Sequence, residues 1–417
     1  MIPDHLTPWG DEFGELTLRF GSLPKGGDAF SFTLGSMPYA VFQVSMLKGL
    51  AKFFLGDRRE FDAFQVEVST FSSLECQVCP RSVFAEKWVF QNMSLDTFQK
   101  IRPHFPRTRW VSFRGWGDPL ENENLLDMLR QVKEAECAAA LTTNGSLLTE
   151  EYSRQLLRTD PALIVVALEL ATQAVQDRLA RIGSDFKRIL DQVQALVKLR
   201  KESGGKKPAI KLSFPMTRLN MGELPGLVPL SAKLGVDEVI FTNLDYLPED
   251  RWNILRAFYH ESPTQAFEKT IEEIHRQGKE QKISVYCYPL KAEEKPVCEA
   301  DPPNQVFFAV DGSVAPCPYL RIPKKGDLPR IFMNQEYAVP QTFFGNVHAE
   351  DFIETWNKES YRVFRRVFED RRKAERNVGQ GLDAFSNLRP GAESQTPMEP
   401  PPPLSEVCRT CYKAYGI

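Results

Sequence analysis

The sequence has few histidines and no surplus of positive charge. Five histidines are spread over 417 residues without a paired spacing, so none is assigned as a metal ligand. The 52 lysines and arginines are balanced by 55 acidic residues, which leaves a formal net charge of -3. This balance argues against a nucleic-acid partner or an anionic membrane partner. The chain also lacks a glycine-rich phosphate loop and a nucleophile elbow.

Long apolar runs and an export signal are also missing. No basic residue precedes Arg19 and the first residues contain no apolar core, unlike a secretory signal. The apolar stretch from Met37 to Leu55 is interrupted by Lys48 and Lys52 and is too short to span a bilayer. We therefore expect a cytoplasmic protein with no membrane partner. In such a protein, eight cysteines indicate metal or redox roles rather than a disulfide framework.

A hydrophobic content of 42% and a charged content of 26% over 417 residues suit one large domain plus a smaller one. We expect an N-terminal extension at 1–63, a parallel partial barrel at 64–290 and a small C-terminal α+β domain at 291–417. The proline-rich segment 390–404 contains four consecutive prolines and predicts an extended linker.

The order of short apolar segments and amphipathic segments predicts an α/β fold. Phe186, Ile189, Leu190, Val193 and Leu196 recur at helical spacing, and a second helix is expected after the N-cap Ser94. Strands separated by helices of this length form a parallel sheet with right-handed crossovers. The predicted strands are 65–69, 109–114, 138–142, 163–168, 209–214, 236–242 and 283–287.

The first predicted strand runs into a loop with a Cys-x-x-Cys spacing, formed by Cys76 and Cys79. Alone, this pair is compatible with a redox or zinc site. With the segments that follow it, the loop resembles the Cys-x3-Cys-x2-Cys motif of the radical S-adenosylmethionine superfamily. In that superfamily three cysteines hold a [4Fe-4S] cluster. Ser72 stands at the first cysteine position. The sequence leaves open an oxygen-ligated cluster, a labile three-iron cluster, an engineered change or a natural loss of radical chemistry.

Further segments match the same superfamily in chain order. Trp116, Gly117 and Asp118 lie in a segment that resembles its Gly-Gly-Glu-Pro element. The resemblance implies that this element holds the amino group of S-adenosylmethionine. Asn144 ends the third strand, and Glu169 stands where an acid contacts the cofactor ribose. Ala167 replaces the hydroxyl residue that the fourth strand usually carries there.

A second cysteine set occupies the C-terminal third. Cys298, Cys317, Cys408 and Cys411 resemble the ligands of a SPASM or twitch extension, which binds an auxiliary [4Fe-4S] cluster. Zinc is the alternative that these ligand types allow. Cys287 is a possible substitute ligand, although a buried strand position suits it better. The charged segment 362–376 predicts a solvated helix.

Within the superfamily, the chain resembles maturases of tungsten-cofactor oxidoreductases. This implies reductive cleavage of S-adenosylmethionine to a 5'-deoxyadenosyl radical, with an external electron donor and a protein, peptide or cofactor precursor as substrate. The departures at Ser72 and Ala167 support an alternative. The chain would then be a non-catalytic binding or scaffold module that keeps only the auxiliary cluster.

Overall fold

The computed structural model describes residues 16–19, 31–34, 59–74, 76–168, 186–260, 264–386 and 401–417. Residues 1–58 and 59–417 form two compact units. In the first unit, β1 (Leu16–Arg19) pairs antiparallel with β2 (Ser31–Leu34). Most of the expected extension, including the apolar stretch 37–55, lies outside the described residues, as does most of the segment 390–404. No helix in the described part has the length and apolar character needed to cross a membrane.

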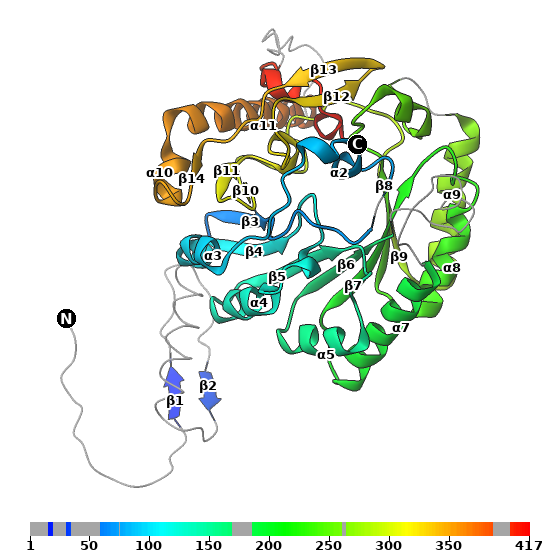
Figure 1. Cartoon of the computed structure of the whole chain (residues 1–417), viewed down its shortest axis with the longest axis vertical. Helices are drawn as coiled ribbons and strands as arrows, with labels where there is room; N and C mark the ends of the chain where they lie inside the picture. The colour runs from blue at the N-terminus through cyan, green and yellow to red at the C-terminus, as the bar shows by residue number, and fades with distance from the viewer. Residues whose placement is uncertain are drawn as a thin grey trace, which may run out of the picture. The chain divides into compact units, whose positions relative to one another are not determined.

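A curved sheet of seven parallel strands forms the centre of the second unit (Figure 1). The strands pair in chain order, as expected for a partial barrel. They are β3 (Phe61–Val66), β4 (Thr108–Phe113), β5 (Ala138–Thr143), β6 (Leu163–Ala167), β7 (Ala209–Met216), β8 (Glu238–Asn243) and β9 (Ser284–Cys287).

The boundaries predicted for the first strand, 65–69, are wrong. The strand starts at Phe61, where aromatic packing against Phe352 buries its first residue. It ends at Val66 because the backbone then changes partners. Glu67 donates its N–H to Phe308, and Ser69 forms a bridge with Asn92 instead of continuing along β4.

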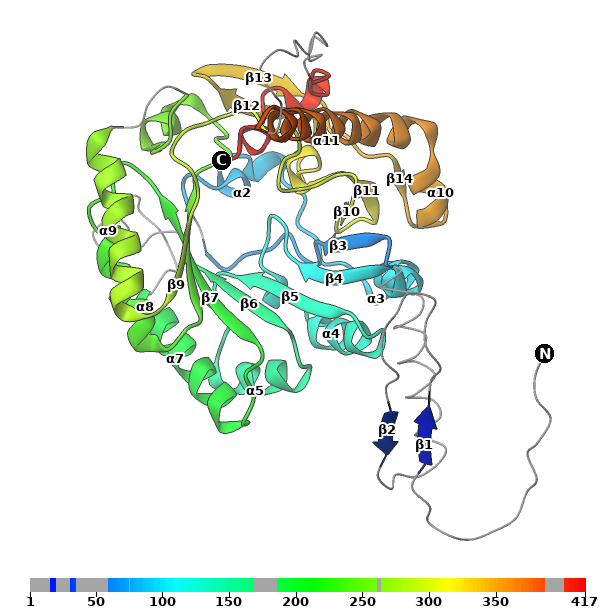
Figure 2. The ribbon, with the colours of Figure 1, turned by 180° about the vertical axis from the view of Figure 1, so that it is seen from behind.

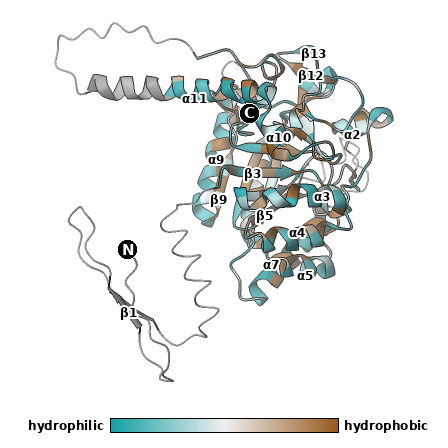
Figure 3. Cartoon of the chain, turned by 90° about the vertical axis from the view of Figure 1, so that its left-hand side faces the viewer, coloured by the Kyte–Doolittle hydropathy of each residue, from teal (hydrophilic) through white to brown (hydrophobic). Residues whose placement is uncertain are grey.

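Among the described residues, six helices lie along the outer side of the curved sheet (Figures 1 and 2). The predicted apolar stripe on α7 is confirmed, because Ile189, Val193 and Leu196 are fully buried or nearly so. The Ser94 hydroxyl caps α3 by accepting the Thr97 N–H at 3.1 Å. In Figure 3 the labelled helices among these carry both hydrophilic and hydrophobic segments. The six are α3 (Leu95–Ile101), α4 (Leu125–Glu134), α5 (Glu150–Arg158), α7 (Phe186–Glu202), α8 (Leu224–Leu234) and α9 (Gln265–Gln281).

The C-terminal part extends the same sheet. β10 (Gln305–Phe308) pairs parallel with β3 and antiparallel with β11 (Ser313–Ala315), which pairs in turn with β14 (Gly345–Asn346). Gly312 adopts φ +80° in the turn between β10 and β11. Because β3 and β10 lie about 240 residues apart, no local pattern could predict their pairing. A separate two-stranded sheet contains β12 (Leu328–Phe332) and β13 (Gln335–Val339).

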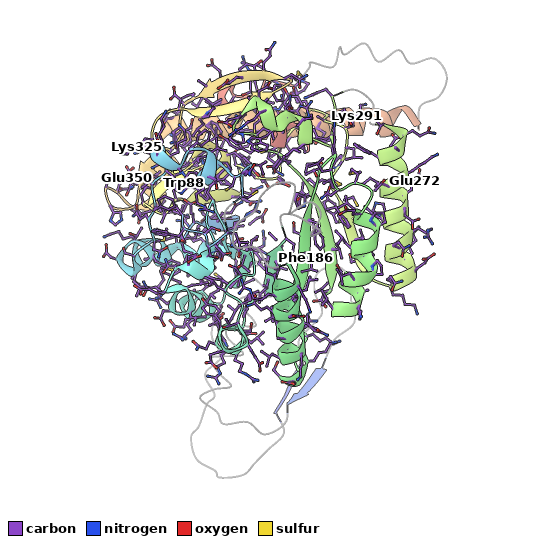
Figure 4. The ribbon with its side chains drawn as sticks, turned by 45° about the vertical axis from the view of Figure 1, so that its right-hand side comes forward. Trp88, Phe186, Glu272, Lys291, Lys325 and Glu350 are labelled. Carbon is purple, nitrogen blue, oxygen red and sulfur yellow. The ribbon has the colours of Figure 1, made fainter. Side chains whose placement is uncertain are left out.

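Short helices connect these layers. The loop after α2 (Pro80–Val83) meets the C-terminal part, because Lys325 donates its N–H to the Lys87 carbonyl at 2.9 Å. Trp88 and Lys325 lie close together in Figure 4. The remaining short helices are η1 (Ala85–Lys87), η2 (Arg102–Arg107), η3 (Pro119–Glu121), η4 (Asp250–Leu255), η5 (Pro318–Leu320), α10 (Phe352–Asn357), η6 (Glu406–Cys408) and η7 (Tyr412–Tyr415).

The charged segment 362–376 lies on the long helix α11 (Glu359–Ser386), but it is not solvated throughout. Arg365 and Arg371 are 6% and 2% exposed. The Arg365 guanidinium lies 3.5 Å from the ring centre of Trp356. Arg371 donates to the carbonyl oxygens of Pro296 and Lys295 at 3.0 and 3.1 Å. Arg371 also donates to the Pro402 carbonyl. The prediction of a solvated helix is therefore wrong for its inner face, where Arg371 binds the loops that precede Cys298 and Cys408.

We expect Arg371→Met to lower the free energy of unfolding by about 3 kcal/mol. The substitution keeps the apolar stem but leaves buried carbonyls and Glu294, which accepts from Arg371 at 2.6 Å, without their donor. Urea unfolding followed by circular dichroism measures the loss. The control Lys373→Met alters a side chain on the same helix that is 69% exposed, and it should change stability by less than about 0.5 kcal/mol. Equal losses in both variants would contradict the buried role of Arg371.

Candidate functional site

A cavity of about 140 Å³ lies at the carboxyl ends of β3, β4, β5 and β6. Active sites of barrel folds form at this end of the strands. The cavity brings together Ser72, Cys76, Cys79, Trp116, Gly117, Asp118 and Asn144, which are all but one of the residues expected around the first cluster and its cofactor. The exception, Glu169, lies outside the described residues. We call this space the first cavity.

The loop that carries the first cysteines is held at both ends. Cys79 donates its N–H to the Cys76 carbonyl at 3.0 Å and precedes α2. At the other end, Asn144 donates its side-chain N–H to the Ser72 hydroxyl at 3.2 Å. Ser73 and Ser146 share a hydroxyl hydrogen bond of 2.6 Å. These contacts tie the loop to the end of β5, so the two predicted segments lie against each other.

Gly117 permits a close approach between this loop and the segment after β4. A Cβ atom at position 117 would lie 2.5 Å from the carbonyl oxygens of Ser69 and Phe71. The neighbouring Asp118 N–H donates to the Phe71 carbonyl at 2.7 Å. The glycine is required by backbone packing here, independently of any contact with a cofactor.

Asp118 fastens the segment after β4 to the end of β5. Its carboxylate accepts the backbone N–H of Leu120 and of Asn144 at 2.9 and 2.7 Å, and both of its oxygens accept the Thr143 hydroxyl. Burial raises the pKa of Asp118 to about 6, although these hydrogen bonds oppose the rise. The contact between this region and a cofactor amino group stays a prediction. The hydrogen bonds show that Asp118 positions the segment after β4 against the end of β5.

Trp116 forms part of the wall between the first cavity and the C-terminal domain. Its indole N–H donates to the Pro318 carbonyl at 2.9 Å, and its ring packs edge-on against Tyr319 at 5.8 Å. The side chain is half-buried; it lines the first cavity and packs against Tyr319. Ala167, the last residue of β6, also lines the cavity and offers no polar side-chain atom.

The four C-terminal cysteines line a second cavity. Cys298 precedes β10, Cys317 follows β11, and Cys408 and Cys411 belong to the terminal segment. Residues more than one hundred positions apart therefore converge, as expected for a shared metal site. Their roles as iron ligands stay a prediction. Among the described residues, no group of three histidine, cysteine or acidic side chains has the arrangement of a single-ion site.

Burial and repulsion between neighbouring thiolates raise the pKa values of three of these cysteines. Burial raises the pKa of Cys298 to about 12, and nearby Cys411 adds to the rise. Burial and the neighbouring cysteines likewise raise the pKa of Cys317 and of Cys408 above the ordinary range. Thiolates in this position need a positive partner such as metal ions. Cys287 does not line the cavity, and burial alone raises its pKa to about 12.

A buried lysine connects this domain to the barrel. Lys413 is 6% exposed, and its ammonium lies 2.7 Å from both Asp245 and Glu299. Tyr319 donates to the same Asp245 at 2.8 Å, and the Tyr288 ring faces the ammonium at 4.7 Å. Each residue of the C-terminal part in this network lies within two positions of one of the cysteines. The network therefore fixes the cysteine segments against the ends of β8 and β9.

The comparisons with known proteins agree with this geometry. The SPASM family, described as an iron-sulfur cluster-binding domain, matches residues 298–378. The chain is 27% identical over 307 residues to the tungsten-containing aldehyde ferredoxin oxidoreductase cofactor-modifying protein of Pyrococcus furiosus. That alignment covers 72% of this chain and 82% of the relative.

Solved structures share the fold. Streptococcus suis SuiB bound to S-adenosylmethionine superposes with a TM-score of 0.54 at 15% identity, covering 80% of this chain and 74% of SuiB. SuiB bound to its precursor peptide SuiA gives a TM-score of 0.52 at 14% identity, covering 82% and 75% of the two chains. The chain therefore shares the fold of SuiB, and its residues 298–378 resemble the SPASM iron-sulfur cluster-binding domain. The matched family is described as binding an iron-sulfur cluster, and residues 298–378 begin at Cys298 and include Cys317.

Sequence reasoning missed two charged residues of the site, Glu67 and Arg114. Glu67 follows β3 and is 1% exposed; it accepts the backbone N–H groups of Trp116 at 2.8 Å and Val310 at 3.4 Å. Arg114 follows β4 and lines the first cavity. Arg114 had one available signal, its position at the end of the predicted strand 109–114, where barrel side chains carry function. Glu67 had none, because it lay in the middle of the predicted strand 65–69.

Glu67 should give the protein a measurable pH dependence. Burial raises its pKa from 4.5 to about 7. Between these values the folded protein keeps a proton that the unfolded chain has released, so stability falls as the pH rises through this window, by up to about 3 kcal/mol. Glu67→Gln removes this dependence. Its unfolding free energy relative to the wild type should therefore rise by about 3 kcal/mol between pH 4.5 and pH 8.

Urea unfolding at several pH values measures this difference. The amide of the variant leaves one backbone N–H without an acceptor, which adds an offset that does not vary with pH. Glu134→Gln, at a side chain that is 62% exposed, is the control and should give a nearly constant difference. If the Glu67→Gln difference were equally constant, the raised pKa of Glu67 would be wrong.

Proposed function

We propose that this chain binds a [4Fe-4S] cluster and S-adenosylmethionine in the first cavity and modifies a protein, peptide or cofactor precursor by radical chemistry. One observation carries the proposal. Ser72, Cys76 and Cys79 line the same cavity as the Trp116–Asp118 segment and Asn144, at the carboxyl ends of four parallel strands. A partial barrel open at this end can admit a substrate beside the cofactor.

The residues present fit a cluster with mixed ligands. Cys76 and Cys79 supply two thiols, and the Ser72 oxygen faces the same space. That oxygen accepts N–H groups from Asn144 at 3.2 Å and from Leu74 at 3.4 Å. Two N–H donors stabilise an oxygen that loses its proton, which is what ligation of iron by serine requires. When bound and reduced, the cluster would supply the electron that cleaves S-adenosylmethionine.

The chain's own residues would position the reactants and limit access of water. Asp118 holds the backbone of the segment after β4 against the cysteine loop. Trp116 and Tyr319 form an aromatic wall beside the cavity. A wall of this kind keeps water from a reactive intermediate. Glu169, which lies outside the described residues, keeps its proposed role at the cofactor ribose.

The substrate class follows from the relatives and is part of the proposal. The Pyrococcus furiosus relative is named as a modifier of the cofactor of a tungsten-containing oxidoreductase, and SuiB was solved with a precursor peptide. A cofactor precursor or a peptide is therefore the proposed substrate. An external electron donor would reduce the clusters.

A second function is favoured by two positions in the first cavity. Ser72 supplies no thiol, and Ala167 supplies no hydroxyl. A chain that cannot retain the first cluster would act as a binding or scaffold module with the SPASM cluster alone. The two functions differ in how much iron the chain holds and in its response to S-adenosylmethionine.

We expect the anaerobically reconstituted protein to hold about eight irons per chain, as two [4Fe-4S] clusters require. Its reduced EPR spectrum should change on addition of S-adenosylmethionine. Cys317→Ala should remove about four irons without abolishing that change, because Cys317 lies in the second cavity. About four irons in the wild type, with a spectrum insensitive to S-adenosylmethionine, would contradict radical chemistry and support the scaffold function.

Ser72→Cys separates the two functions further. If the chain is an enzyme, the added thiol should strengthen cluster retention and leave the release of 5'-deoxyadenosine intact or increased. If it is a scaffold, the variant should gain a cluster without gaining turnover, since Ala167 remains. Product chromatography and iron analysis measure the two effects. Ser73→Cys, one residue away, is the matched control and should not improve iron retention.

A further inference from the structure

A third cavity of about 250 Å³ lies beside the first. Gln65 of β3, Arg114 after β4 and Tyr288 after β9 form its barrel side. Glu299 and Tyr319 contribute from the C-terminal domain. Arg114 also lines the first cavity, and Tyr319 also lines the second. The third cavity therefore adjoins both, in the place where a substrate would meet the cofactor.

Gln65 presents a buried acceptor without a donor. The residue is 9% exposed, and its side-chain N–H donates to the Gln305 side-chain oxygen at 3.1 Å. The Gln305 side-chain N–H donates to the Glu299 carbonyl at 3.3 Å. Because a carbonyl can only accept, this chain of bonds fixes the orientation of both amides. The Gln65 Oε1 atom, in the described structure, then has no hydrogen-bond partner.

A buried oxygen without a hydrogen-bond donor, such as Gln65 Oε1, is unfavourable unless a bound group supplies the donor. A buried acceptor without a partner destabilises a protein by about 1–3 kcal/mol. Buried side-chain polar atoms are normally satisfied by protein or ordered water. Gln65 lines the third cavity, so an N–H or O–H group seated there, from a ligand or from water, can supply the missing donor.

Arg114 supplies a positive charge that is not neutralised by a direct partner. Its side chain is exposed and, within the described part of the chain, makes no ion pair or hydrogen bond. The acidic group in the same wall, Glu299, is already committed to Lys413 at 2.7 Å and to the Tyr288 hydroxyl. Arg114 is thus available for an anion, and a guanidinium binds carboxylate or phosphate through paired hydrogen bonds.

We propose that the third cavity binds a substrate group in which an anion adjoins a hydrogen-bond donor. The anion binds Arg114, and the donor binds the Gln65 oxygen. A volume of 250 Å³ is below the roughly 300–1,000 Å³ of sites for whole small molecules, so the cavity takes a side chain or a head group. An acidic side chain beside a peptide N–H and a phosphate ester share this chemistry. The role as a substrate site rests on the proposed function, whereas the ligand chemistry rests on the cavity.

Binding of two matched probes tests the proposal on the full reconstituted chain without reductant and with saturating S-adenosylmethionine. N-acetyl-L-aspartate methylamide carries the anion and the donor, and N-acetyl-L-asparagine methylamide lacks the anion. Inorganic phosphate represents the head-group source. Ligand-observed NMR gives the dissociation constants. We expect the aspartate probe or phosphate to bind at least about tenfold more tightly than the asparagine probe.

Variants assign the two contacts. Arg114→Gln should weaken the preferred anionic probe about tenfold or more, Arg114→Lys should weaken it less, and Gln65→Leu should weaken it by several-fold. Arg102→Gln removes an exposed arginine paired with Glu134 and should leave binding unchanged. Because Arg114 is exposed, its variants should fold, and thermal unfolding checks this. Preference for the aspartate probe identifies a peptide source, and preference for phosphate identifies a phosphate ester.

Three results would overturn the proposal: no probe binds the wild type with or without S-adenosylmethionine, Arg114→Gln binds as well as the wild type, or a probe binds only when S-adenosylmethionine is left out. The last would assign Arg114 to the carboxylate of the cofactor. Release of 5'-deoxyadenosine, measured separately after reduction, tests the proposed function. Release without probe binding refutes the third cavity alone, whereas probe binding without release refutes the radical function and leaves the ligand chemistry standing.

Discussion

The carboxylate of Glu67 is the contact on which the arrangement of the site depends. It lies directly after the first barrel strand and accepts backbone N–H groups from Trp116 and Val310, one from the barrel and one from the C-terminal hairpin. A Cβ atom at Gly115 would lie 2.5 Å from this side chain, so the contact also requires the neighbouring glycine. One buried acid thus joins three segments that are far apart in sequence. Its raised pKa shows that burial outweighs the two hydrogen bonds.

The consequence is a single sheet that continues from the barrel into the C-terminal domain. β10 pairs with β3 just before Glu67 bonds to the hairpin, and Phe64, Phe308 and Phe352 pack together with ring separations of 5.1–5.3 Å. A covalent linker alone would let the two domains move. Here the shared strands and the aromatic core hold the second cavity at a set position relative to the first. The aromatic pair Trp116 and Tyr319 joins the two cavities, because Trp116 lines the first and Tyr319 lines the second.

The sequence predicted the features that depend on residues close together in the chain. The stripe on α7, the Ser94 cap and the order of the parallel strands follow from spacing and side-chain chemistry within short windows. The start of β3 was wrong because its first residue is buried by Phe352, nearly 300 positions away. The burial of Arg371 could not be predicted from the charged sequence of α11. A buried arginine is recognised only once the carbonyl oxygens that it binds are known. Motif resemblance brought Ser72, Cys76 and Asn144 together, but Glu67, Gln65 and Arg114 belong to no motif.

At Ser72, the hydrogen bonds that hold the loop and the ligation of iron favour different side chains. The fold is satisfied by serine, because the hydroxyl accepts from Asn144 and from the Leu74 backbone and so closes the loop onto β5. A cysteine sulfur is a weaker acceptor, so these contacts suit oxygen at least as well as they would suit sulfur. Cluster chemistry favours sulfur, which binds iron as a thiolate without the high pKa of a hydroxyl. The two N–H donors reduce this disadvantage by stabilising the deprotonated oxygen. The same pair of contacts lets serine keep the loop in place and would favour an oxygen ligand in the proposed cluster.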